Sequence, residues 1–89
     1  MTENNPITMD IKIAEVLKEK LQAVSVEVED ESWRHKGHAG ALEGGHFNVD
    51  VVSPLFKGKT PVERHQMVYE ALSEELKSIH ALSIKARTV

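Results

Sequence analysis

The fold is decided by residues 46–88, which read HFNVDVVSPLFKGKTPVERHQMVYEALSEELKSIHALSIKART. Apolar residues first alternate with polar ones, then recur every three or four positions, and then alternate again, which predicts a strand, a helix and a strand. Thr60, Pro61 and Glu63 form a capping box with proline at the first helical position, so the helix should begin there and run to about Lys77. Since a strand–helix–strand crossover is almost always right-handed, the two strands should be parallel neighbours.

The same periods predict which side chains face the core. The helix should bury a stripe that recurs every three or four positions: Val62, His65, Val68, Leu72 and Leu76. The last strand, from Ile79 to about Thr88, should turn every second side chain to one face: His80, Leu82, Ile84 and Ala86. The alternation alone therefore favours a core-facing His80.

The first half of the chain shows a helix followed by a strand. From Met9 an amphipathic helix is expected, capped by Thr8 or Asp10, with four apolar side chains on one face: Ile13, Leu17, Leu21 and Val24. A half-buried strand follows, with alternating apolar positions at Val24, Val26 and Val28. Residues 1–8 are expected to be a disordered N-terminal segment, and 9–89 to form a single domain.

The expected fold class is α+β, with a three-stranded mixed sheet whose helices pack on one face while the other face meets water. Between the first two strands lies SWRHKGHAGALEGG, residues 32–45, which contains four glycines. Loops of this length are uncommon in small domains and are often functional. This loop is therefore the first place to look for functional side chains.

Composition excludes several classes of protein. A chain of 89 residues has room for a modest core, which makes a deep substrate cavity unexpected. The absence of cysteine rules out disulfides and thiolate metal sites, and no apolar run is long enough for a membrane helix. Without a signal-peptide pattern, a cytoplasmic location is expected. The net charge of −3 argues against bulk nucleic-acid affinity, although a local basic patch remains compatible with it.

Catalytic signatures are absent from the sequence. There is no G-x-S-x-G elbow, no H-E-x-x-H pair, no Walker loop and no dinucleotide-binding glycine pattern. The acidic run from Glu27 to Glu31 is better explained as a solvated strand face than as a carboxylate pair for catalysis. The protein is therefore not expected to be an enzyme.

The five histidines carry the remaining chemistry. His35 and His38 lie three residues apart in the loop, and His80 opens the last strand, so a flexible loop histidine could meet a fixed one. Imidazole is a good ligand for zinc, copper and iron. Structural explanations compete: loop histidines are usually solvated, His65 falls on a buried stripe, and His46 is expected to face solvent. Spacing alone does not establish a metal site.

The element order α-β-β-α-β is also similar to that of the second class of KH domains, which bind single-stranded nucleic acid. Those domains use a G-x-x-G loop to approach the phosphate backbone. The corresponding stretch, Phe56-Lys57-Gly58-Lys59, has one glycine. RNA binding through such a loop is therefore not expected.

Five ordered motifs together resemble the BolA family, over nearly the whole chain after residue 9. They are Glu31-Ser32-x-x-His35, His46-Phe47-x-Val49, Val52-Ser53-x-x-Phe56-x-Gly58, Arg64-His65-x-x-Val68-Tyr69-x-x-Leu72-x-x-Glu75-Leu76 and Ile79-His80-Ala81-Leu82. The resemblance implies an α-β-β-α-α-β class II KH-like fold, in which the extra short helix falls within residues 54–58.

The resemblance also implies a function. Members of the family act as adaptors that pair with a monothiol glutaredoxin and share a 2Fe–2S cluster with it and with glutathione. The family's ligand positions match His80 and His35, while the longer loop of this chain makes His38 the alternative to His35. Two imidazoles can hold one iron, as in Rieske centres. Because the chain lacks cysteine, the partner and glutathione must supply sulfur, and the cluster would not be bound by this chain alone.

Some family members are described instead as DNA-binding transcriptional regulators of stress and morphology genes. In this alternative, the helix-turn-helix-like region 54–70 contacts DNA, and Lys57, Lys59 and Arg64 meet the phosphates. The negative net charge counts against DNA binding as the main activity.

Overall fold

The computed structural model describes residues 8–31 and 45–89. Their elements, in chain order, are α1 (Met9–Lys20), β1 (Ser25–Asp30), β2 (Gly45–Val52), the 3-10 helix η3 (Pro54–Phe56), α2 (Pro61–Ala71), the 3-10 helix η4 (Glu75–Ser78) and β3 (Ile79–Arg87). The short helix expected between residues 54 and 58 is present as η3, whereas residues 1–7 and 32–44 lie outside the described part.

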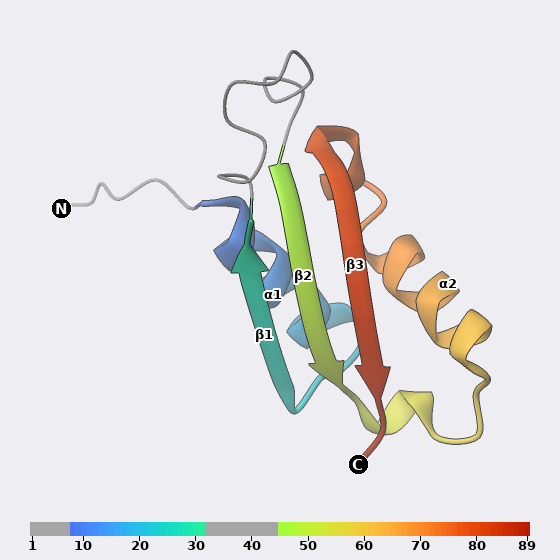
Figure 1. Cartoon of the computed structure of the whole chain (residues 1–89). Coiled ribbons are helices and arrows are strands. Elements are labelled where there is room, and N and C mark those ends of the chain that lie inside the picture. Colours follow the sequence, from blue (N-terminus) through green and yellow to red (C-terminus); the bar gives the residue numbers. More distant parts are fainter. Residues whose placement is uncertain (1–7, 32–44) are drawn as a thin grey trace, which may run out of the picture.

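The strands form one sheet in the order β1-β2-β3. β1 pairs antiparallel with β2, and β3 pairs parallel with β2, as the crossover rule predicts. Both α-helices lie behind the sheet, so the opposite face of the sheet is open (Figure 1). The expected α+β class, with a mixed sheet and its helices on one face, is confirmed.

The core lies between the middle strand and the two α-helices. Its fully or nearly fully buried apolar side chains are Ile13, Leu17, Leu21, Phe47, Val49, Val51, Phe56, Val68, Ala71 and Leu72. Three of the four apolar positions expected from the first helix are therefore confirmed. The fourth, Val24, is 63% exposed, because α1 ends at Lys20 and Val24 lies outside both the helix and β1.

The expectation for the second helix was wrong in its length and in part of its face. α2 ends at Ala71, and a separate 3-10 helix follows, while Val62 is 66% exposed and His65 is also exposed. Val68 and Leu72 are buried as expected, but the inner position of the first turns is held by the half-buried Arg64 instead of His65. The buried face of the helix therefore keeps Val68 and gains Arg64, Met67 and Ala71, while Val62 and His65 lie outside it.

The termini of the two helices differ in how they are capped. At α2 the expected capping box is present: Glu63 N–H donates to Thr60 Oγ1 at 3.1 Å, and Thr60 N–H donates to Glu63 Oε1 at 2.9 Å. At α1 the capping residue is Thr8, but its hydroxyl donates to the carboxylate of Asp10 and makes no capping bond to the backbone. The hydrogen bond from Thr8 lowers the pKa of Asp10.

Ser53, which is completely buried, links three elements at the carboxyl end of β2. Its Oγ donates to the carbonyl of Leu21 at 2.6 Å and accepts from Leu55 N–H at 3.0 Å, which caps η3. Its own N–H donates to the carbonyl of Arg87 at 2.9 Å. One small side chain therefore ties the end of α1 and the start of η3 to the end of β2, and its backbone ties in the end of β3.

Replacing Ser53 with alanine should lower the free energy of unfolding by about 1–3 kcal/mol, because the carbonyl of Leu21 stays buried without its donor. Urea unfolding followed by circular dichroism measures the change. Ser83→Ala, at an exposed position of β3, serves as the control and should alter stability by less than about 0.5 kcal/mol. Equal effects of the two substitutions would contradict this role of Ser53.

Candidate functional site

The start of β3 departs from a regular strand at His80. Gly45 pairs with Ile79, but the next residue of β2, His46, pairs with Ala81, so His80 is an extra residue in β3. An extra residue of this kind is a β-bulge, which bends the strand and changes the direction of a side chain. The imidazole of His80 is exposed as a result.

The bulge corrects the expectation that His80 shares the core face with Leu82. Ile79 and Leu82 both pack against the core although they are three residues apart, which alternation alone would not allow. Beyond the bulge the expected alternation is observed, with Leu82, Ile84 and Ala86 half-buried. The core contacts of this part of β3 are therefore made by Ile79 and Leu82, while His80 is exposed.

The end of β1 and the start of β2, which flank residues 32–44 in the sequence, lie at the same end of the sheet as the start of β3. Glu31, just after β1, donates its N–H to the carbonyl of His46 at 2.7 Å, and Gly45 pairs with Ile79. In Figure 1 this end of the sheet is at the top, and His80 belongs to it. The described chain therefore stops at Glu31 and resumes at Gly45 at the end of the sheet that carries His80. His35 and His38 fall within that segment and lie outside the described residues.

Two further titratable side chains occupy this end of the sheet. Glu31 is only 6% exposed, and His46 is half-buried although the sequence favoured a solvent-facing position for it. Neither was predicted to be a site residue, because a strand pattern carries no information about burial at the strand's end. Across residues 8–31 and 45–89, no group of three or more His, Asp or Glu side chains is arranged to hold a metal ion. A metal centre at His80 would need ligands from elsewhere.

The basic residues of the alternative DNA hypothesis lie at the other end of the sheet. Lys57 and Lys59 are exposed on either side of Gly58, whose φ of 80° suits glycine. Arg64 donates through Nε to the carbonyl of Lys59 at 3.0 Å and through Nη1 to that of Ala86 at 3.3 Å. Its guanidinium carbon lies 6.0 Å from the centre of the Phe56 ring. Arg64 thus joins α2 to the end of β3.

The N-terminus of α2, between these lysines and Arg64, already receives a negative charge from the chain itself. The N–H of Thr60 donates to the carboxylate of Glu63 and lowers the pKa of that carboxyl. Glu63 is therefore ionised at neutral pH at the place where a helix would otherwise attract a phosphate.

Among the described helices, none combines the length and the apolar character that crossing a membrane demands.

Comparison with known proteins then identifies the family. The family model described as BolA-like protein matches residues 17–89. The chain belongs to the BolA family. The resemblance seen in its motifs is thereby confirmed, and the motifs at Ile79-His80-Ala81-Leu82 and at Val52-Ser53 coincide with the bulge and with the buried serine.

Two curated BolA relatives and one solved structure illustrate the similarity. The chain is 46% identical over 86 residues to SufE-like protein 1, chloroplastic/mitochondrial, of Arabidopsis thaliana. The match covers 88% of this chain but 23% of that protein. It is 42% identical over 79 residues to the DNA-binding transcriptional regulator BolA of Escherichia coli (strain K12). That match covers 88% of this chain and 73% of the regulator. The solved BolA domain of SufE1 from Arabidopsis thaliana matches with a TM-score of 0.78, 45% identity and coverage of 94% and 95%.

His80→Ala should change the free energy of unfolding by less than about 0.5 kcal/mol, because the side chain is exposed and outside the core. Chemical unfolding of the purified variant measures this. Leu72→Ala, at a completely buried position, should cost about 2–5 kcal/mol in the same assay. A loss at His80 as large as that at Leu72 would show that His80 is a structural residue.

Proposed function

We propose that this BolA-family chain is a non-enzymatic adaptor that pairs with a monothiol glutaredoxin and shares a 2Fe–2S cluster with it, in iron–sulfur cluster trafficking or iron homeostasis. The observation that carries the proposal is the exposure of His80 in a bulge at the start of β3, in a chain of this family. Bulges are over-represented next to functional sites, where they redirect a side chain.

In this proposal His80 is one ligand, and His35 is the second, with His38 as the alternative. His35 follows Glu31 by four residues in the sequence, and a fully extended chain of that length covers at most about 14 Å. Because Glu31 is hydrogen-bonded to His46 at the same end of the sheet as His80, chain connectivity is compatible with a shared site. Connectivity also permits His38, which is seven residues from Gly45.

The donor set fits a cluster that is shared and does not fit one that is held alone. Iron in a 2Fe–2S cluster accepts neutral imidazole nitrogen, but the remaining ligands are usually thiolates. The chain has no cysteine, so those thiolates come from glutaredoxin and glutathione. Because the imidazoles bind in their neutral form, acidification should weaken the complex. Within the pair, this chain's residues would hold the cluster on one side.

Mixing the protein with a cluster-loaded monothiol glutaredoxin should change the visible absorption and circular dichroism spectra, since imidazole ligation alters the electronic transitions of the cluster. His80→Ala should abolish most of the change, and so should His35→Ala combined with His80→Ala. His38→Ala should leave the change intact if His35 is the loop ligand. His65→Ala, at an exposed position of α2, is the matched control and should behave as the wild type.

A spectral change that persists in the variant lacking both His35 and His80 would overturn this ligand assignment. If His38→Ala abolished the change while His35→Ala did not, His38 would be the loop ligand.

A second candidate, DNA binding by region 54–70, is favoured by one observation: Lys57 and Lys59 are both exposed next to the start of α2. The Escherichia coli relative is also named a DNA-binding transcriptional regulator. Two features oppose it, because the carboxylate of Glu63 occupies the helix N-terminus and Arg64 donates two of its hydrogen bonds within the chain. Cluster sharing is therefore the better-supported function.

Titration of duplex DNA at several salt concentrations tests the second candidate. If the lysines bind phosphates, replacing both Lys57 and Lys59 with glutamine should weaken binding and reduce the salt slope by about two. Binding that is undetectable at low salt would dispose of DNA recognition.

A further inference from the structure

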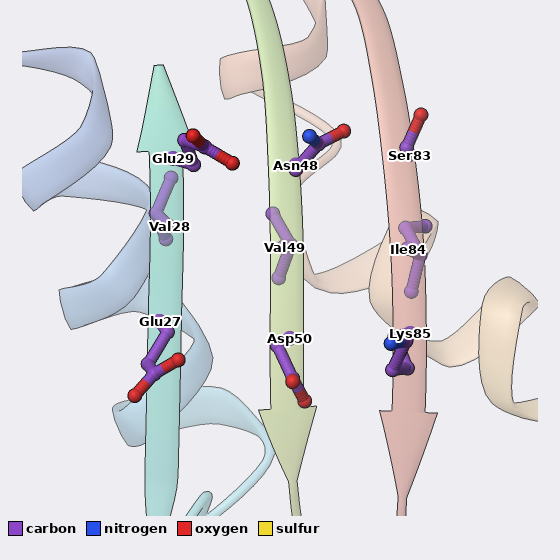
Figure 2. Close-up of a pocket in the computed structure, with 9 residues that line it drawn as sticks. All are labelled: Glu27, Val28, Glu29, Asn48, Val49, Asp50, Ser83, Ile84 and Lys85. Atoms are coloured by element: carbon purple, nitrogen blue, oxygen red, sulfur yellow. The ribbon is translucent and has the colours of Figure 1, made fainter. Parts of the chain in front are cut away.

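The open face of the sheet carries mostly polar side chains. Pairs of side chains from each strand project from it and surround a hollow of about 620 Å³: Glu27 and Glu29 from β1, Asn48 and Asp50 from β2, and Ser83 and Lys85 from β3 (Figure 2). Both α-helices lie on the other side of the sheet, so no described helix covers this face (Figure 1).

The charges on this face are not balanced across the strands. Glu27 and Asp50 are direct neighbours in the antiparallel pair, and like charges in that arrangement repel. Asp50 is compensated, because Nη2 of Arg87 donates to both of its carboxylate oxygens at 2.9 and 3.1 Å. Within residues 8–31 and 45–89, no ion pair joins Glu27 or Glu29 to a basic side chain. The β1 side of the hollow therefore keeps two uncompensated negative charges.

The hollow lies next to the end of the sheet that carries His80. Asn48 pairs with Ser83 at the upper edge of the hollow, His46 pairs with Ala81 at the next position in phase, and His80 adjoins Ala81. A protein that contacts His80 from the open side would therefore also lie close to the hollow.

Size indicates how much of a partner interface the face can supply. Three strands about 4.8 Å apart and six residues long present a footprint of roughly 300 Å². A stable interface buries about 800 Å² on each partner, so this face would be one part of a contact whose remainder lies at the His80 end.

We propose that the open face of the sheet is a docking surface for the protein that meets His80, and that this partner presents lysine or arginine side chains to Glu27 and Glu29. The identity of the partner rests on the proposed function. Cations at this position would neutralise Glu27 and Glu29, whereas Asp50 already has Arg87 and its neighbour in the sheet, Lys85, beside it. A partner with a basic surface opposite β1 would therefore bind more tightly than one without it.

The test compares two double variants with the same change of charge. Glu27→Lys with Glu29→Lys reverses the charge at the β1 side of the open face. Glu15→Lys with Glu19→Lys reverses the charge at two exposed positions of α1, behind the sheet. Calorimetric titration with cluster-free monothiol glutaredoxin should show about tenfold weaker binding for the first variant at low salt, and a difference that shrinks at high salt. The α1 variant should bind within about twofold of the wild type.

Equal dissociation constants for the two double variants would overturn the docking surface. Circular dichroism establishes that each variant is folded, and Glu27→Gln with Glu29→Gln should give an intermediate loss of affinity. Sedimentation of the chain alone separates a partner surface from self-association: if the face reversal alters only the oligomeric state, the proposed occupant is wrong.

The outcome is distinguishable from that of the proposed function. A normal cluster spectrum together with unchanged affinity of the face variant would overturn the docking surface and leave cluster sharing intact. Loss of affinity in the face variant, without any cluster spectrum in the wild type, would support the docking surface and contradict cluster sharing.

Discussion

Parallel pairing of β2 and β3 requires the chain to leave the carboxyl end of β2 and return to the amino end of β3, and this requirement shapes the rest of the molecule. The return path consists of η3, α2 and η4, which bring α2 onto the same face as α1 (Figure 1). One face of the sheet is thereby covered and the other is left open. The same pairing places the start of β3 beside the start of β2, where residues 32–44 rejoin the sheet.

The two ends of the sheet are consequently specialised. At the carboxyl end of β2, Ser53 and Arg64 use their hydrogen bonds to join helices to strand ends, so most of the polar chemistry there is structural. At the opposite end, the bulge turns His80 away from the core, and Glu31 and His46 lie on the neighbouring strands. An imidazole at that position can bind a ligand without weakening the packing that holds β3. The fold therefore holds His80 on a strand, and the second ligand that we propose belongs to residues 32–44, outside the described part.

The sequence was sufficient for the architecture because it depends on local and repetitive signals. The capping box at Thr60, the alternation at Phe47, Val49 and Val51, and the crossover rule together predicted the order of elements and the parallel pair. It was insufficient where one residue alters a period. The bulge exposes His80, and Arg64 takes the inner position expected for His65, because three-dimensional packing and not spacing decides both. The ligand roles proposed for His35 and His80 rest on the family resemblance, since histidine spacing by itself favoured structural explanations.

The central claim is that His80 binds iron of a cluster that a glutaredoxin shares with this chain. Pulsed electron paramagnetic resonance on the reduced complex tests it most directly, with nitrogen-15 histidine incorporated only into this chain. The account predicts a nitrogen hyperfine coupling from imidazole that decreases in His80→Ala, whereas His65→Ala leaves it unchanged. A spectrum without coupling to histidine nitrogen of this chain, or a coupling unaltered by His80→Ala, would contradict the account.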